Sequence, residues 1–435
     1  MKALTVPLFS ILFCLLTAIS PSLFSQIRFT QTYQMWNTMA INNLKQTSDS
    51  GYIFCIDADG SMDTVAGNQY GYLIKMSDSG ATQWIKRYPK SDGIKAYDGN
   101  SVIQTSDGGY AIGTDTGGSQ GFIAAYLIKT DPNGNLQWSK YYPGKGASTC
   151  FCVQQTSDGG YILCGMTRQI TSSYHKYFLL KTDNTGAVEW EKSYEDTLLF
   201  QGGDLYTVRE ISDHGYITCG NGYQGGVVIK TDSSGNVLWS NVTNIASEFR
   251  YDIQQTQDGG YIAAGTSISG SIKSASLTRF DPAGNVIWSN NYNSTNGSSD
   301  QGYGVVEVGG GFTFLGNSES THDTWLIHID SAGAVVWARR YLDTEVFGHA
   351  LTLELTNDGG YAIASNYAST PTERYALIIK TNQNGAGACN DISFAPVTSP
   401  YPAYTAVGMY EYSHPYVVNM NTPLLPSSLV DSLGL

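Results

Sequence analysis

The sequence has little charge and no sustained helical pattern. Charged residues make up 14% of the 435 residues, and nothing after the N-terminus shows helical periodicity. Glycine (48) and tyrosine (30) are abundant instead, which is typical of many short strands joined by tight turns. A chain of this length exceeds the size at which one simple core stops growing, so we expect several domains or one repeat architecture.

Positive charge is also scarce, since the formal net charge is −13. Nucleic acids and anionic membrane surfaces bind proteins that displace counterions with Lys and Arg. We therefore expect no nucleic-acid partner. The charge does not discriminate among neutral ligands.

Cysteine chemistry is not indicated either, because Cys-x-x-Cys pairs and His-rich metal spacings are missing. Cys150 and Cys152 flank Phe151, and an i,i+2 pair on one strand lacks favourable disulfide geometry. Three others follow a tyrosine by three residues and are expected to be small, buried core residues: Cys55, Cys164 and Cys219.

The first 25 residues differ from the rest of the chain. Lys2 precedes an almost continuous apolar run from Ala3 to Ile19, and Ser25 is a small residue before Gln26, which together predict a cleavable secretion signal. A transmembrane anchor is the alternative, although a run of about 17 residues is short for one. We expect a secreted or cell-surface protein without a membrane span after cleavage of residues 1–25.

A turn motif recurs about every 50 residues. Residues 105–110 read Thr-Ser-Asp-Gly-Gly-Tyr, and related segments occur in six other places. The closing aromatic residues are Tyr52, Tyr110, Tyr161, Tyr216, Tyr261, Phe312 and Tyr361. Asp-Gly and Gly-Gly steps suit tight hairpins, and repeats of this length are typical of propellers.

A second motif lies within each copy. Residues 130–138 read Thr-Asp-Pro-Asn-Gly-Asn-Leu-Gln-Trp, and similar segments end in Trp84, Trp190, Trp239, Trp288 and Trp337. The seventh copy, at 381–385, has no tryptophan after it. Each copy divides into four antiparallel strands, which is the pattern of a propeller blade. We therefore predict an all-β, seven-bladed propeller over residues 26–390.

The N-terminal segment is expected to complete the seventh blade. Residues 28–33 resemble the strands around Trp84 and Trp138, so we predict that they pair with the strand at 375–381 and close the ring. Residues 391–435 are rich in proline and carry no blade motif. They are expected to be a tail or linker whose removal leaves the propeller intact.

The two motifs resemble the repeats of secreted β-propeller proteins of the Bacteroidetes type, over about residues 27–390. That resemblance implies export by type IX secretion, although no sorting domain is recognisable in residues 391–435. The Asp-x-x-Gly-Asn-x-x-Trp element also resembles the tryptophan-docking repeat of quinoprotein dehydrogenases. Those enzymes need adjacent cysteines, which are missing here. We expect no cofactor, and a structural role for the tryptophans between blades.

Catalytic and metal motifs are weak. Asp57, Asp59 and Asp63 space three carboxylates along one loop, but the further ligands of an EF-hand are missing, so a solvated loop is the preferred interpretation. No histidine lies in a nucleophile motif. A glycosidase needs a pair of carboxyl groups, and spacing along the chain cannot show whether two carboxylates from different blades form such a pair.

Four aromatic residues share one register, five residues before the turn threonine or its equivalent: Phe151, Tyr206, Tyr251 and Tyr303. The long, unequal connections all fall on one face of a propeller, where recognition usually resides. These rings are candidates for stacking on sugars or peptides, and blade packing explains them equally well.

The leading hypothesis is a monomeric, secreted or cell-surface binding or adhesion module for an extracellular glycan or protein. Its alternatives are a glycan-active extracellular enzyme with acids from different blades, and a purely structural scaffold.

Overall fold

The structure is a computed structural model. It describes residues 28–33, 39–59, 69–88, 97–116, 123–143, 146–169, 174–196, 202–223, 225–243, 249–295, 298–341, 349–370, 373–387, 391–400, 404–406, 409–413 and 420–421. The proposed signal, residues 1–25, lies outside these ranges. Within them, no helix has the length and apolarity needed to cross a membrane.

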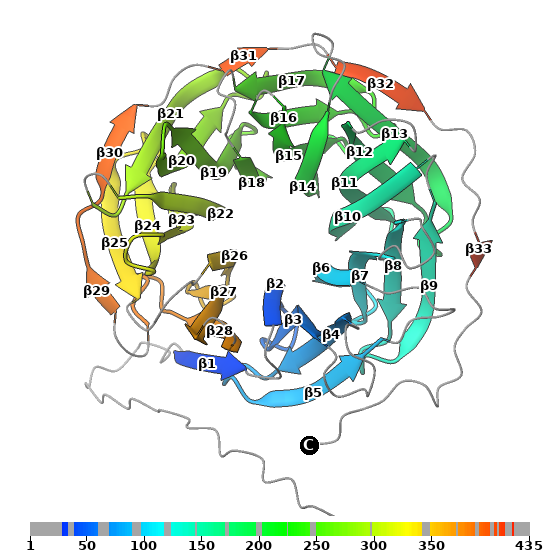
Figure 1. The fold of residues 1–435 in the computed structure, drawn as a ribbon, viewed down its shortest axis with the longest axis horizontal. Coiled ribbons are helices and arrows are strands. Elements are labelled where there is room, and N and C mark those ends of the chain that lie inside the picture. Colours follow the sequence, from blue (N-terminus) through cyan, green and yellow to red (C-terminus); the bar gives the residue numbers. More distant parts are fainter. Residues whose placement is uncertain are drawn as a thin grey trace, which may run out of the picture.

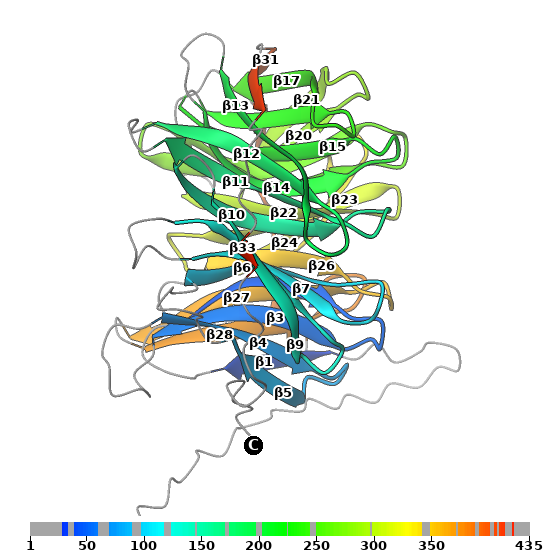
Figure 2. The ribbon, with the colours of Figure 1, turned by 90° about the vertical axis from the view of Figure 1, so that its right-hand side faces the viewer.

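Seven antiparallel sheets are arranged around a central axis, as Figure 1 shows. Each sheet has four core strands, and the first strand of each lies nearest the axis. Seen from the side, these strands run across the thickness of the ring (Figure 2). The predicted seven-bladed propeller is therefore confirmed.

The first four blades follow the chain directly, each from its innermost to its outermost strand. Blade 1 contains β2 (Met39–Gln46), β3 (Tyr52–Asp59), β4 (Gln69–Met76) and β5 (Thr82–Arg87). Blade 2 contains β6 (Tyr97–Gln104), β7 (Tyr110–Asp115), β8 (Ala125–Thr130) and β9 (Leu136–Tyr142). Blade 3 contains β10 (Gly146–Gln155), β11 (Tyr161–Gln169), β12 (His175–Thr182) and β13 (Val188–Asp196). Blade 4 contains β14 (Gly203–Glu210), β15 (Tyr216–Gly222), β16 (Gly226–Thr231) and β17 (Val237–Thr243).

The last three blades continue around the ring to the N-terminal strand. Blade 5 contains β18 (Phe249–Gln255), β19 (Tyr261–Ser269), β20 (Ile272–Phe280) and β21 (Val286–Asn293). Blade 6 contains β22 (Asp300–Val308), β23 (Gly311–Ser318), β24 (Thr324–Asp330) and β25 (Val335–Tyr341). Blade 7 contains β26 (His349–Leu355), β27 (Tyr361–Thr370), β28 (Glu373–Lys380) and β1 (Phe29–Tyr33).

The N-terminal strand closes the ring as predicted. β1 pairs antiparallel with β28, from Phe29 opposite Lys380 to Tyr33 opposite Ala376. Phe29 also replaces the tryptophan that blade 7 lacks, because its ring packs against Gly80 of blade 1. Backbone pairing of β1 thus completes blade 7, and the Phe29 ring connects that blade to blade 1.

The tryptophans pack between blades, which confirms their predicted structural role. The ring of Trp138 covers Gly186 in the turn of the next blade, and a Cβ at Gly186 would lie 2.8 Å from that ring. Glycine is required at this turn for a second reason, its φ of 76°. The same contact joins Trp84 to Gly134, Trp190 to Gly235, Trp239 to Gly284 and Trp337 to Gly385, whereas a Cβ at Gly333 would lie 3.7 Å from the Trp288 ring and closer to Asn290.

A largely buried basic residue on the third strand pairs with the turn aspartate in six blades. The pairs are Lys75–Asp49, Lys129–Asp107, Lys181–Asp158, Lys230–Asp213, Arg279–Asp258 and Lys380–Asp358. In the described part of blade 6, Gly309 and Gly310 form the turn and His328 takes the basic position. Among its described residues, blade 6 therefore has neither the turn aspartate nor the Lys or Arg, which is consistent because a buried cation without its carboxylate is strongly destabilising.

The C-terminal segment is bound to the propeller, which the sequence did not predict. Five short strands of this segment, here called the belt, add antiparallel to the outer strands of blades 6, 5, 4, 3 and 2 (Figure 1). They are β29 (Asp391–Ser393), β30 (Val397–Pro400), β31 (Tyr404–Ala406), β32 (Met409–Ser413) and β33 (Met420–Asn421). The expectation of an independent tail or linker is corrected for these residues, because open blade edges can pair with any extended segment.

The predicted burial of three cysteines is confirmed. Cys55, Cys164 and Cys219 are buried in the cores between sheets. Cys150 and Cys152, on either side of Phe151, are buried as well. These thiols fill small spaces between blades.

Candidate functional site

The four aromatic residues singled out in the sequence all occupy β-bulges on innermost strands. The strand register skips Phe151 in β10 and Tyr206 in β14. It skips Tyr251 in β18 and Tyr303 in β22 in the same way. A bulge leaves its extra residue out of the ladder and re-aims the side chain, so each of these four blades presents one aromatic residue to the channel.

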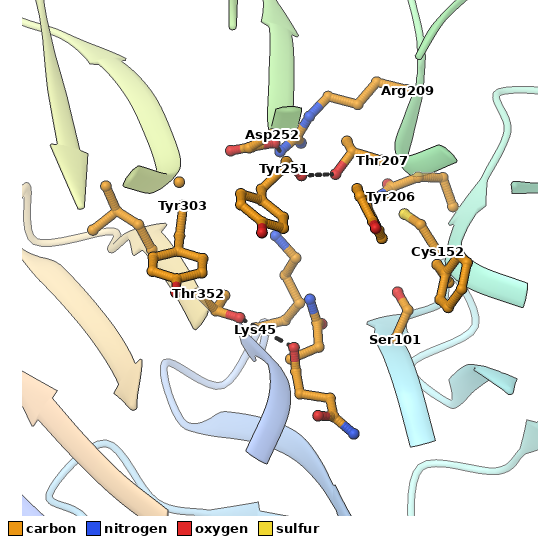
Figure 3. A pocket seen from close by; sticks show the side chains of 16 residues that line it. Lys45, Ser101, Cys152, Tyr206, Thr207, Arg209, Tyr251, Asp252, Tyr303 and Thr352 are labelled. Atoms are coloured by element: carbon orange, nitrogen blue, oxygen red, sulfur yellow. Dashed lines mark hydrogen bonds and ion pairs between the residues drawn. The ribbon is translucent and has the colours of Figure 1, made fainter. Parts of the chain in front are cut away.

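The structure brings these four residues together in one arc. Successive ring centroids lie 5.5 Å apart for Phe151–Tyr206, 5.3 Å for Tyr206–Tyr251 and 5.1 Å for Tyr251–Tyr303. All four line a central cavity of about 240 Å³ (Figure 3). The arc belongs to blades 3 to 6, which are neighbours in the ring.

The other side of the cavity is polar. The bulge residue of blade 1 is Asn42, and polar side chains of blades 1, 2 and 7 complete the wall. They include Asn43, Ser101 and Thr352; in Figure 3, Thr352 lies next to Tyr303 and Ser101 lies near Cys152. Among the described residues, the cavity therefore has an aromatic wall facing mostly polar side chains, with Leu353 of blade 7 as an apolar exception.

Two basic side chains line the cavity, and each has an acidic partner. Arg209 Nη2 lies 3.0 Å from Asp252 Oδ1, and its Nε donates to the Ile253 carbonyl at 2.7 Å. Lys45 Nζ lies 2.7 Å from Glu354 Oε2. Burial alone would lower the pKa of Arg209, but the carboxylate of Asp252 raises it above its ordinary value. The cavity is therefore close to electrically neutral.

The tyrosine hydroxyls remain protonated across the physiological pH range. Burial raises the pKa of Tyr251 to about 12. Burial also raises the pKa values of Tyr206 and Tyr303, with smaller contributions from nearby carboxylates and Tyr251. Each hydroxyl can thus donate a hydrogen bond, and the Tyr303 hydroxyl already donates to the Gln301 amide oxygen.

Side chains that follow the bulges tie neighbouring blades together. Ser101 Oγ accepts from Val153 N at 3.3 Å, and Asn43 Oδ1 accepts from Val102 N at 3.3 Å. Further around the ring, Thr207 Oγ1 donates to the Tyr251 carbonyl at 2.7 Å. The Thr207 bond fixes the backbone of Tyr251 directly, and such preorganisation reduces the entropy lost on binding.

Sequence analysis missed the two ion pairs at the cavity. Arg209 and Lys45 both lie two residues before the turn position, but the same position holds Ile103 in blade 2 and Gln154 in blade 3. Only their common position, two residues before the turn, could have pointed to Arg209 and Lys45, because the residue type at that position varies between blades. Only the closed ring places these side chains in one space.

The acidic triplet considered for metal binding stays a prediction. Asp57 and Asp59 lie at the end of β3, whereas Asp63 is outside the described residues. Within the ranges that the structure describes, no group of three His, Cys, Asp or Glu side chains is placed to hold a metal ion.

Comparisons with known proteins show no family. No family model matches the chain, and no curated protein matches it. A solved protein of unknown function from Bacteroides caccae is 15% identical, with a TM-score of 0.40 over 61% of this chain and 89% of that one. Sqt1 from Chaetomium thermophilum is 11% identical, with a TM-score of 0.42 over 81% of this chain and 100% of that one. The Bacillus subtilis arabinanase Arb43A is 10% identical, with a TM-score of 0.28 over 66% of this chain and 95% of that one. At these values the likenesses carry no functional argument.

Proposed function

We propose that this propeller is a non-enzymatic binding module that holds a glycan unit in its central cavity. The observation that carries the proposal is the arc of four rings, from Phe151 to Tyr303, facing amide and hydroxyl side chains. A sugar ring has an apolar C–H face that stacks on aromatic rings and hydroxyl edges that need hydrogen-bond partners. The two walls match these two requirements.

The size of the cavity supports a small ligand or the end of a longer one. Its volume of about 240 Å³ lies just below the range of about 300 to 1,000 Å³ of pockets for drug-sized molecules. A single sugar ring is of the right size. The rest of a chain would extend along the propeller axis.

The carboxylates near the cavity favour binding over glycan hydrolysis. A glycosidase needs two carboxyl groups, one acting as acid and the other as nucleophile or base. Here Asp252 pairs with Arg209 through Oδ1 and accepts from Val305 N through Oδ2 at 3.1 Å. Glu354 is bonded to Lys45 at 2.7 Å. Both groups are already engaged within the blade walls.

The test is calorimetric titration with a panel of neutral mono- and oligosaccharides. Tyr251→Ala should weaken binding about tenfold, which corresponds to about 1.4 kcal/mol. Tyr251→Phe should retain most of the affinity, because the ring remains. Tyr223→Ala is the matched control, since that tyrosine is 69% exposed and lies outside the cavity.

Two results would reject the proposal. One is unchanged affinity in Tyr251→Ala for a glycan that the parent binds. The other is failure of the parent to bind any glycan in the panel. Turnover of a bound glycan that Asp252→Asn abolishes would instead support a glycan-active enzyme.

We also propose that this binding takes place outside the cytoplasm. The support is the resemblance of residues 1–25 to a secretion signal and of the repeats to secreted Bacteroidetes-type propellers, for which the type IX route is the finer hypothesis. N-terminal sequencing of protein exported from a bacterial host should find Gln26 as the first residue. Retention of Met1 in the mature protein would contradict this.

A further inference from the structure

Two cysteines of blade 3 lie directly opposite each other on neighbouring strands. Cys152 on β10 is in register with Cys164 on β11, immediately after the bulge at Phe151. Both side chains belong to the core between blades 3 and 4, and a side-chain hydrogen bond joins the two thiol groups. The pair is therefore a dithiol whose sulfur atoms are neighbours.

The bulge at Phe151 decides which cysteines can pair. In a regular strand, Cys150 and Cys152 would point to the same face. Because the bulge inserts one residue, Cys150 lies opposite Gly165 and packs in the core between blades 2 and 3. Cys152 packs on the other face of the blade, where the cysteine opposite it is Cys164.

Of the described cysteines, Cys152 is the one that lines the central cavity (Figure 3). It is 7% exposed, whereas Cys164 has no exposed surface. A small molecule in the cavity can therefore reach the sulfur of Cys152 but not that of Cys164.

The surroundings favour the thiolate of Cys152. The hydrogen bond from Cys164 lowers the pKa of the Cys152 thiol despite its burial, and the positive charge of Arg209 acts in the same direction. Burial and the same hydrogen bond raise the pKa of Cys164 well above its ordinary value. Since the thiolate is the nucleophile in thiol chemistry, the two cysteines are suited to successive roles.

We propose that this pair is a modification site for low-molecular-weight disulfides, with Cys152 as the reactive thiol and Cys164 as the resolving thiol. The Cys152 thiolate attacks a disulfide R–S–S–R, forms the mixed disulfide Cys152–S–S–R and releases one R–S⁻. Cys164 then loses its proton and attacks Cys152 Sγ, which releases the second R–S⁻. The two protons lost by the cysteines go to the two leaving groups, so the products are one protein disulfide and two R–SH.

The strand pairing allows the second step with a small movement. Directly opposite residues on antiparallel strands have Cβ atoms about 4.5 to 5.5 Å apart, and a disulfide needs about 3.5 to 4.5 Å. Closing that gap stores strain, and strained disulfides are readily reduced. We therefore expect a reversible link, which does not depend on glycan binding.

The test treats the reduced full chain with hydroxyethyl disulfide, blocks the remaining thiols by alkylation and maps the peptides by mass spectrometry. Chymotrypsin cuts after Phe151 and Tyr161, so the three cysteines of blade 3 fall on separate peptides. The expected product is a peptide pair linked through Cys152 and Cys164. Treatment with dithiothreitol should separate it again.

Two variants separate the two steps. Cys164→Ala should stop the reaction at the mixed disulfide, so Cys152 keeps the added group. Cys152→Ala should leave Cys164 unmodified, because no small molecule reaches its sulfur. Cys150→Ala is the matched control, since this cysteine packs in the other core, and it should link at the rate of the parent.

The unmodified chain decides the outcome even where a variant fails to fold. In it, Cys152 should react about tenfold faster than Cys219, which is buried in the core between blades 4 and 5. Equal rates at the two cysteines would overturn the proposal. So would an unreacted Cys152, or a link from Cys152 to a cysteine other than Cys164.

Discussion

The ring and the belt are held by different interactions. In the ring, each blade inserts an aromatic side chain into the next one; Trp138, for example, packs on Gly186 and lies 5.9 Å from the Tyr161 ring. The belt strands pair through the backbone, and most side chains of residues 391–400 are exposed. Side-chain contacts with blade 6 are made by Asp391, which pairs with Arg339, and by Phe394, which lies under Arg340. The comparison teaches that side-chain packing dominates between blades, whereas backbone pairing dominates between the belt and the blades.

The largest effect should come from opening the ring. Deleting residues 26–34 removes β1 and the Phe29 contact with Gly80. Each lost backbone hydrogen bond is worth about 0.5 to 1.5 kcal/mol, and loss of the buried Tyr33 ring of β1 adds about 3 to 5 kcal/mol. Thermal melting and size-exclusion chromatography should show severe destabilisation or aggregation. An unchanged melting temperature would contradict the closed-ring account.

A smaller effect should come from weakening one joint of the ring. Trp239→Ala removes the ring that covers Gly284, and we expect a loss near the lower end of about 3 to 5 kcal/mol because the indole is partly exposed. Leu238→Ala is the matched control, since this neighbouring side chain is 55% exposed. Denaturant titration should separate the two variants. Equal losses would show that the contact between blades is unimportant.

Removing the belt should affect stability less than opening the ring. Truncation after Asn390 was expected from sequence to be harmless, but the structure shows that it exposes the outer strands of five blades. We now expect a folded propeller with a slightly lower melting temperature and concentration-dependent association through those edges. Light scattering at several protein concentrations measures this. A drop in stability as large as that of the β1 deletion would remove the distinction between ring and belt.

The smallest effect concerns the ion pairs inside single blades. Burial tends to raise the pKa of Asp158, but hydrogen bonds from Lys181 and Thr156 lower it to about 2. A lowered pKa contributes stability above the unfolded value of about 3.9, and this contribution disappears as the pH falls through about 2. Asp158→Asn should therefore flatten the loss of stability between pH 4 and pH 2.

The size of this change should stay below about 1 kcal/mol, because the Asp158 side chain is 56% exposed and solvent screens the pair. Denaturant titration at pH 4 and pH 2 measures it. Blade 6, where His328 replaces the lysine, shows that a blade folds without the pair. An identical pH profile in parent and variant would show that this pair contributes nothing.

Several features followed from sequence because they are local and repeated. The spacing from Tyr52 to Tyr361 predicted seven blades, and the absent seventh tryptophan predicted closure by residues 28–33. The common register of Phe151, Tyr206, Tyr251 and Tyr303 placed them on equivalent sites. Their bulges were not predicted, because a bulge is defined only by the register of the partner strand.

The cavity and the belt were beyond sequence reasoning for a different reason. Arg209 meets Asp252 across two blades, and Lys45 meets Glu354 across the junction of the first and last blades. The belt has no blade motif, since backbone pairing makes few demands on residue type.

By itself the sequence determined the blade, because turn glycines and alternating strands act over a few residues, and the tryptophan recurs with the same period. Only the tertiary structure decided which side chains share the channel and which edges the C-terminal segment covers. Those contacts join residues that are far apart in the chain, and they exist only after the ring has closed.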